Sequence, residues 1–129
     1  FGTELKRRIM LGSFVLSTGY YDAYFSKAQK IRRLLVDKIN ELFSRYDAVL
    51  MPVSPTTAFE IGANDKDPVA MYLADIYTVF ANLNGILGIA LPLFSHSNNL
   101  PFGLQVMTNK GNELILLQVS DELLKLKKL

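Results

Sequence analysis

One long apolar stretch does most to limit the folds open to this chain. Residues 70–93, AMYLADIYTVFANLNGILGIALPL, carry a single formal charge, on Asp75. The stretch is long enough to raise the question of a membrane span, but polar, glycine and proline residues argue against one. Those residues are Asp75, Asn82, Asn84, Gly85, Gly88 and Pro92. The stretch therefore predicts a helix that runs to about Asn84, followed by a buried strand.

The residues around this stretch mark where its helix begins and where the strands lie. Asp67 and Pro68 predict the helix start, because Asp is a favoured N-cap and Pro is favoured at the first helical position. The run GIALPL, residues 88–93, predicts the strand that follows. Two further apolar runs, DAVLMP at 47–52 and FGLQVMT at 102–108, predict two more strands.

Amphipathic helices are predicted on either side of these strands. Thr3 can cap a first helix that runs to about Thr18, with Gly19 as its stop. Apolar residues at spacings of three and four predict a long helix over 22–46 and a final helix over 112–127. The buried stripe of the final helix would be Leu116, Val119, Leu123 and Leu126. Because helices and buried strands alternate, we expect an α/β layer with helices covering a sheet of about three strands.

Length and composition indicate one globular domain or a piece of one. The chain has 129 residues, of which 50% are hydrophobic and 20% charged, and this is enough to bury a core. The mean hydropathy of +0.19 is high for a small free-standing domain. It fits a piece of a larger protein or one side of an obligate interface. Because the chain begins with Phe rather than Met, we expect it to be a fragment.

Charge and cysteine content narrow the classes of function. The net charge of +2 is too small to indicate nucleic-acid binding, and the basic clusters fit solvated helix faces. These clusters are Lys6 to Arg8, Lys30 with Arg32 and Arg33, and Lys125 with Lys127 and Lys128. The absence of cysteine excludes disulfides and thiolate catalysis and fits a reducing compartment. No signal peptide is visible, so we expect a cytoplasmic protein that does not bind a membrane.

Few residues could carry chemistry by themselves. His96 is the only histidine, and it stands in a polar loop that predicts a surface position. One histidine without cysteine cannot build a familiar zinc site, so no metal site is predicted. Ser54 lies between two prolines with no base nearby in sequence, which predicts a loop serine rather than a nucleophile. No G-x-S-x-G elbow, P-loop or G-x-G-x-x-G is present. These residues indicate no self-contained catalytic machinery.

Four segments together resemble one family. They are FGTELKRRIMLGSFVLSTGYYDAYFSKAQKIR, YDAVLMPVSPTTAF, DPVAMYLADIYTVFANLNGILGIALPL and LPFGLQVM. In this order they are similar to the C-terminal portion of the A subunits of glutamyl-tRNA(Gln) amidotransferases, which are members of the amidase signature family. The resemblance covers nearly the whole chain. KRRIMLG, GYYDAY and SPTTAF are its most specific parts, whereas LPFGLQ occurs across amidases.

The resemblance implies a fold, an activity and partners. It implies that residues 1–129 are the C-terminal part of an amidase-signature domain, an α/β fold with a mixed sheet between helical layers. It implies a parent that hydrolyses glutamine to glutamate and ammonia. The ammonia would pass to a partner subunit, which converts Glu-tRNA(Gln) to Gln-tRNA(Gln). The implied partners are subunits B and C and, mainly through the partner subunit, the charged tRNA. ATP and Mg²⁺ would be used by the partner subunit, with no cofactor in this chain.

The catalytic residues that the resemblance implies lie outside this sequence. The family uses a serine nucleophile, a second serine and a lysine, from a Gly/Ser-rich signature and the segment before it. Neither segment is present here. No catalytic residue is therefore predicted in this chain, and the chain alone is expected to be inactive.

Two substrate-recognition residues are implied within this sequence. The arginine that holds the glutamine α-carboxylate would be Arg8, and the aspartate that holds its α-ammonium would be Asp75. A guanidinium can hold a carboxylate through two parallel hydrogen bonds. A carboxylate in an apolar wall is costly unless it is paired. The alternatives are Arg7 in place of Arg8, a solvated Arg8, and an Asp75 that bonds Thr78, bonds the next turn or pairs with a lysine.

Two other functional classes stay open. One is an amidase-signature hydrolase of a small amide other than glutamine, and the other is a non-catalytic scaffold. The sequence also leaves open whether Asn-tRNA formation is served. Asn84 and Leu87 depart from the family pattern, in which alanine and proline are expected. These departures would affect packing near the pocket rather than the two recognition residues.

Overall fold

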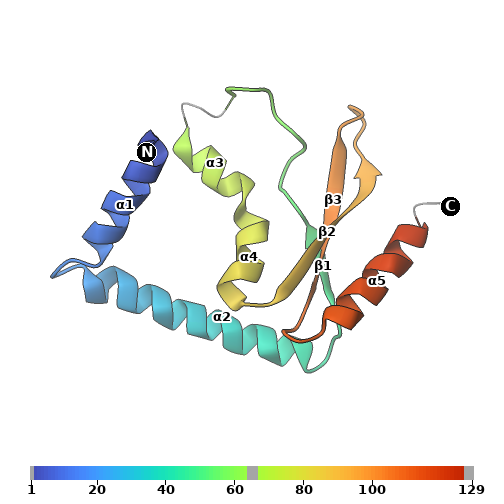
Figure 1. The fold of residues 1–129 in the computed structure, drawn as a ribbon, viewed down its shortest axis with the longest axis horizontal. Helices are drawn as coiled ribbons and strands as arrows, with labels where there is room; N and C mark the ends of the chain where they lie inside the picture. Colours follow the sequence, from blue (N-terminus) through green and yellow to red (C-terminus); the bar gives the residue numbers. More distant parts are fainter. Residues whose placement is uncertain (1, 64–66, 127–129) are drawn as a thin grey trace. The chain divides into compact units, whose positions relative to one another are not determined.

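Residues 2–63 and 67–126 are described by the computed structural model (Figure 1). The chain divides into two units, Phe1–Asp37 and Lys38–Leu129. Lys127 and Lys128 of the C-terminal basic cluster lie outside the described residues.

The first unit opens with helix α1, Thr3–Val15. Thr3 was predicted as the cap, but Gly2 occupies the N-cap position and Thr3 is the first helical residue. The helix also ends before the predicted Thr18. The backbone N–H and the hydroxyl of Ser17 donate to the carbonyl oxygen of Phe14, at 3.0 and 2.6 Å. Side-chain bonds of this kind compete with helix continuation, and the chain then turns through Gly19 at φ +86°.

The long helix predicted over 22–46 is present with different ends. It begins as a π-helix, η1, Tyr21–Ser26, and passes directly into α2, Lys27–Phe43. Two ring contacts join α1 to η1: Phe14 lies 4.1 Å from Tyr20, and Tyr20 lies 6.0 Å from Tyr24, between ring centroids. Ile39 is the residue of α2 that is fully buried. The predicted apolar stripe is thus buried at Ile39 and half-buried at Leu35 and Leu42, whereas Ile31 is 51% exposed.

The second unit is built on a sheet of three strands, as predicted. β1, Val49–Pro52, β2, Leu87–Ser95, and β3, Pro101–Thr108, lie in the order β1-β3-β2. Both pairings are antiparallel, whereas the resemblance implied a mixed sheet. The reason is local for β2 and β3, because a connection as short as 96–100 joins only antiparallel neighbours. Within the described residues the sheet is therefore antiparallel.

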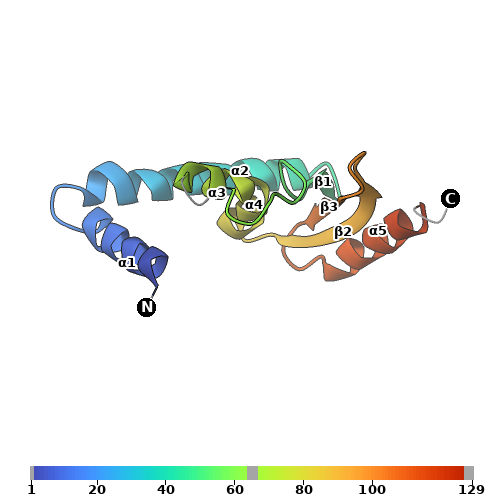
Figure 2. The same cartoon turned by 90° about the horizontal axis from the view of Figure 1, so that it is seen from above.

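Helix α5, Glu113–Leu126, covers one face of this sheet (Figures 1 and 2). Leu91 of β2, Val106 of β3 and Leu116 of α5 form the buried cluster. Partly buried apolar residues pack around it: Ala48, Leu87, Ile89, Leu93, Val119 and Leu123. The predicted stripe of α5 is confirmed except at its end, because Leu126 is 63% exposed.

The opposite face of the sheet meets a helix only over part of its length. The backbone carbonyl of Tyr77, in helix α4, Ile76–Asn84, accepts a hydrogen bond of 3.4 Å from Gln105 of β3. A Cβ added at Gly88 would lie 3.6 Å from that of Ala81. Leu91 is the one buried residue of β1 and β2, whose other residues alternate mainly between half-buried and exposed. The prediction of buried strands is therefore wrong for most of these two strands and holds for the second half of β3.

The predicted helix before β2 is divided in two at Asp75. Helix α3 spans Pro68–Ala74, and α4 begins at Ile76. Asp75 has φ −97° and ψ 4°, and its backbone N–H bonds the carbonyl of Tyr72 in a tighter turn. Aspartate is weak in helix interiors and favoured at helix ends, which suits this position. Helix α4 ends as expected at Gly85, in the left-handed region at φ +67°.

Candidate functional site

Arg8 lies on α1 and is held by an acidic residue one turn before it. Its Nε donates to Oε1 of Glu4 at 3.0 Å, between side chains that are 64% and 51% exposed. The i, i+4 spacing places the two side chains on one helix face. An exposed pair of this kind contributes little to stability. Arg8, the residue predicted to bind the α-carboxylate of glutamine, therefore already binds a side-chain carboxylate in this structure.

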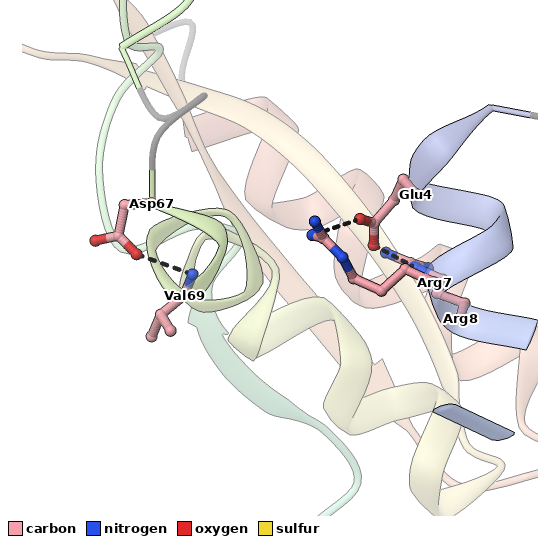
Figure 3. Close-up of polar contacts among 5 residues, drawn as sticks. All are labelled: Glu4, Arg7, Arg8, Asp67 and Val69. Atoms are coloured by element: carbon pink, nitrogen blue, oxygen red, sulfur yellow. Dashed lines mark hydrogen bonds and ion pairs between the residues drawn. The ribbon is translucent and has the colours of Figure 1, made fainter. Parts of the chain in front are cut away.

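Arg7 shares the same acidic partner. Its terminal nitrogen Nη1 lies 3.2 Å from Oε2 of Glu4, so the Glu4 carboxylate bridges both guanidinium groups (Figure 3). Arg7 also lines a hollow of about 550 Å³ along α1, together with Met10 and Phe14. The two arginines share Glu4 but differ in that Arg7 lines this hollow, and the alternative between them stays open.

The apolar side of α1 has no covering within the described residues. No residue of this helix is buried, and its large apolar side chains are 44% to 73% exposed. They are Leu5, Ile9, Met10, Leu11 and Phe14. The arginines of α1 thus stand on a helix whose apolar face remains in solvent.

Asp75 lies in the second unit, in the break between α3 and α4. Its side chain does not cap α4. The hydroxyl of Thr78 donates to the backbone carbonyl oxygen of Asp75 at 3.0 Å, not to its carboxylate. Within residues 2–63 and 67–126 no hydrogen bond or ion pair reaches that carboxylate. Thr78 and the next turn, at Val79, thus bond Asp75 only through its backbone carbonyl. No such bond and no lysine pair reaches its carboxylate in the described part of the chain.

The surroundings of Asp75 are apolar, but they are open to solvent. Tyr72, Ile76 and Val79 on the same two helices are 50%, 50% and 42% exposed, and Asp75 is exposed as well. Hydration therefore satisfies the carboxylate here, and the predicted cost of a buried acid does not arise in this structure. Arg8 and Asp75 belong to different units. Their convergence on one ligand stays a prediction.

Asp67 has the role that the sequence predicted. Its Oδ1 accepts hydrogen bonds from the backbone N–H groups of Val69 and Ala70, at 3.0 and 3.2 Å, and Figure 3 shows the first of these. The two acidic residues that flank α3 therefore differ. Asp67 caps its helix through its side chain, whereas the side chain of Asp75 caps neither α3 nor α4.

A cavity of about 510 Å³ in the second unit was not predicted. Ser54 and His96, which the sequence indicated separately as a loop serine and a surface histidine, both line it. The Ser54 hydroxyl donates to the carbonyl oxygen of Thr56 at 2.7 Å, and Nδ1 of His96 lies 3.2 Å from the Ser97 hydroxyl. In the sequence, the run of hydroxyl residues in SPTTAF was the only hint of this cavity. The fold brings that run next to His96 and Phe102, which lie on and beside the β2–β3 hairpin.

The asparagines at the end of α4 donate side-chain hydrogen bonds to the backbone of the same helix. Nδ2 of Asn84 donates to the carbonyl of Phe80 at 2.9 Å, and Nδ2 of Asn82 to that of Thr78 at 3.3 Å. Asn84 is 8% exposed, and its Oδ1 has no hydrogen-bond partner among the described residues. The replacement of the expected alanine thus leaves a buried acceptor unsatisfied.

The described part of the chain offers neither a metal-binding cluster nor a membrane-crossing helix. No three or more His, Asp or Glu side chains in this part of the chain lie close enough to hold a metal ion. None of the helices described above is both long and apolar enough to cross a membrane.

Comparison with known proteins identifies the family. The family described as Amidase matches residues 1–117. The chain belongs to the amidase family. Among curated amidases, the A subunit of glutamyl-tRNA(Gln) amidotransferase from Ruthia magnifica subsp. Calyptogena magnifica is 52% identical over 122 residues, which are 95% of this chain and 25% of that protein. The chain thus spans about a quarter of the length of the curated relatives that it matches.

Solved amidase structures agree with the fold described above. The crystal structure of the A subunit of glutamyl-tRNA(Gln) amidotransferase from Thermotoga maritima has a TM-score of 0.74 and 50% identity, over 93% of this chain and 26% of that one. The 6-aminohexanoate cyclic dimer hydrolase in complex with its substrate has a TM-score of 0.62 and 26% identity, over 71% and 22%. The prediction of an amidase-signature fold is therefore confirmed.

Proposed function

We propose that this chain is the C-terminal part of the glutaminase subunit of a tRNA-dependent amidotransferase. The identity of about one half to the A subunits of glutamyl-tRNA(Gln) amidotransferases supports this proposal. In it, the parent hydrolyses glutamine, and the ammonia converts Glu-tRNA(Gln) to Gln-tRNA(Gln). The serine and lysine triad lies outside the 129 residues, so this chain alone is inactive and contributes substrate recognition.

The observation that carries the recognition role is the state of Asp75. Its carboxylate has no partner among the described residues, in a helix break surrounded by apolar side chains. If further protein covers those side chains, the carboxylate loses water, and a cation becomes the partner that offsets this loss. The α-ammonium of glutamine is such a cation. We therefore assign Asp75 to the α-ammonium group.

Arg8 is assigned to the α-carboxylate in the same proposal. Its guanidinium already holds the Glu4 carboxylate at 3.0 Å, which is the same chemistry that an amino-acid carboxylate offers. Arg7, bonded to the other oxygen of Glu4 at 3.2 Å, is the alternative. The two can be separated by single substitutions.

The proposed partners and cofactors follow from the same assignment. Subunits B and C would complete the assembly, and the charged tRNA would bind mainly through the partner subunit. That subunit would also use ATP and Mg²⁺, with no cofactor bound by this chain. The proposed location is the cytoplasm.

Glutamine-dependent and ammonia-dependent amidation, measured in the assembled complex, test this proposal. Arg8→Ala or Asp75→Ala should lower kcat/KM for glutamine by about 30- to 5,000-fold, mainly by raising KM. This range corresponds to a loss of about 2–5 kcal/mol of interaction free energy. Amidation driven by free ammonia should be unchanged, because that reaction does not require binding of glutamine. The same experiment with Arg7→Ala decides between the two arginines.

A matched control removes a carboxylate elsewhere. Asp121 lies on α5 and pairs with Lys125 at 2.8 Å, so Asp121→Ala should leave the glutamine KM unchanged. Equal loss of the glutamine and ammonia reactions in Arg8→Ala and Asp75→Ala would indicate a structural role and reject the assignment.

A second candidate is a hydrolase of a small amide other than glutamine. The 26% identity to the 6-aminohexanoate cyclic dimer hydrolase favours it. It predicts turnover of uncharged amides that Arg8→Ala and Asp75→Ala leave intact. Turnover of glutamine alone would reject it.

A further inference from the structure

The cavity of the second unit brings together three ring side chains from three parts of the fold. Tyr77 comes from α4, His96 from the connection after β2, and Phe102 from β3. The end of β1 and the segment after it line the cavity with Pro52 and Pro55 and with the hydroxyls of Ser54, Thr56 and Thr57. A volume of about 510 Å³ lies within the range of small-molecule sites.

The loop side of this cavity is fixed by its own hydrogen bonds. The hydroxyl of Ser54 donates to the Thr56 carbonyl oxygen at 2.7 Å. The N–H of Val53 donates to the carbonyl oxygen of Gly103 at 3.2 Å, which ties the loop to β3. Gly103 permits this approach, because a Cβ there would lie only 3.0 Å from the Val53 side chain. The loop is thus held in place before any ligand enters.

The ring side is fixed as well. Phe102 stacks on Phe94 of β2 with centroids 5.1 Å apart. The N–H of His96 donates to the Leu100 carbonyl oxygen, and the N–H of Asn99 to that of His96, both at 2.9 Å. These contacts hold the Phe102 ring and the backbone that carries His96. Groups that are held before binding lose little freedom when a ligand arrives, which favours affinity.

The chemistry of the lining selects the ligand. None of the lining residues is Asp, Glu, Lys or Arg, so a charged group would lose hydration without gaining a counter-charge. Flat rings and prolines favour a planar, uncharged ring, and the hydroxyls and the imidazole can hydrogen-bond its edge. A nucleobase has both properties, because it stacks through its face and bonds through its edge.

We propose that this cavity, formed by Tyr77, His96, Phe102 and the 52–57 segment, binds the uncharged base of a nucleoside. The base could belong to a free nucleoside or to the end of a single RNA strand. The inference rests on the cavity and does not depend on glutamine as the substrate.

Adenosine titration of the full-length protein that contains this chain tests the inference. His96 lines the cavity, so its imidazole NMR signals, assigned in the full-length protein by comparison with His96→Gln, report on ligand binding there. We expect saturable shifts of these signals with adenosine. Tyr77→Leu and Phe102→Leu should each weaken binding by at least about fivefold, because each removes a stacking ring.

Tyr46→Leu is the matched control, since Tyr46 belongs to the same unit, is 62% exposed and does not line the cavity. It should bind adenosine as the wild type does. A short oligoadenylate that binds more tightly than adenosine assigns the site to an RNA end, and one that binds less tightly assigns it to free nucleosides. Absence of saturable shifts overturns the proposal, as does wild-type affinity in either ring variant. Tyr77→Leu keeps the test decisive if Phe102→Leu fails to fold.

Discussion

At the scale of single residues, neighbouring acidic side chains have different tasks. Asp67 accepts two backbone hydrogen bonds at the start of α3. Asp75, at the start of α4, accepts none through its carboxylate from the described residues. Both have the residue type that favours a helix N-terminus. An aspartate at such a position therefore predicts a helix boundary, and only the hydrogen bonds in the structure show which aspartate stabilises its helix.

This difference gives a prediction for stability. Asp67→Ala should lower the free energy of unfolding by about 1 kcal/mol, the usual cost of a lost N-cap. Asp75→Ala should change it by less than about 0.5 kcal/mol, because an exposed side chain without a bond is lost. Urea unfolding followed by circular dichroism measures both values. An equal loss in the two variants would contradict the assigned roles.

Asn84 shows the limit of prediction from residue type. Its side-chain bond to the backbone at the helix end follows from the usual habit of asparagine and is confirmed at 2.9 Å. Its burial, with Oδ1 unsatisfied, could not be foreseen. Burial depends on the packing of α4 against the sheet, and that packing joins residues far apart in sequence.

At the scale of elements, periodicity predicted the cores of helices better than their ends. The stripe of α5 places Leu116 in the buried cluster with Leu91 and Val106. The end of α1 and the break at Asp75 depend instead on local bonds, such as that from the Ser17 hydroxyl to Phe14. A hydrophobic pattern does not predict such bonds, because it contains no information on polar side chains or on the backbone groups that they bind.

The register of α5 on the sheet can be tested by a pair of adjacent leucines. Leu116 is 8% exposed and Leu117 is 58% exposed. Leu116→Ala should cost about 2–5 kcal/mol of unfolding free energy, because it leaves a cavity in the core. Leu117→Ala should cost less than about 0.5 kcal/mol. Chemical denaturation of both variants checks this, and the reverse order would mean that α5 packs through its other face.

Strand direction was the feature of the sheet that the sequence left undetermined. The apolar runs predicted where β1, β2 and β3 lie, and these positions are confirmed within a few residues. Their pairing is a property of the connections. The short link between β2 and β3 forces an antiparallel hairpin, and Pro92, which lacks an N–H, falls where the register shifts between Leu91 and Phe94 in an edge strand.

At the scale of the whole molecule, both units expose much apolar surface to solvent. The exposed apolar residues of α1 and of the α3–α4 segment are those beside the proposed recognition residues Arg8 and Asp75. The chain spans about a quarter of the length of its relatives. We propose that further protein covers these surfaces in the parent. The motifs identified the family because they are local, whereas the cavity of the second unit depends on three distant segments and was missed.

The central claim is that Asp75 binds the α-ammonium of glutamine, and a matched pair of substrates tests it most directly. Glutamine and 4-carbamoylbutanoate share the carboxylate and the amide, but only glutamine carries the α-ammonium. In the assembled wild-type complex, kcat/KM should favour glutamine by at least about 30-fold. In Asp75→Ala the two substrates should react within about threefold of each other, with little change for 4-carbamoylbutanoate. A preference for glutamine that persists in Asp75→Ala would contradict the claim.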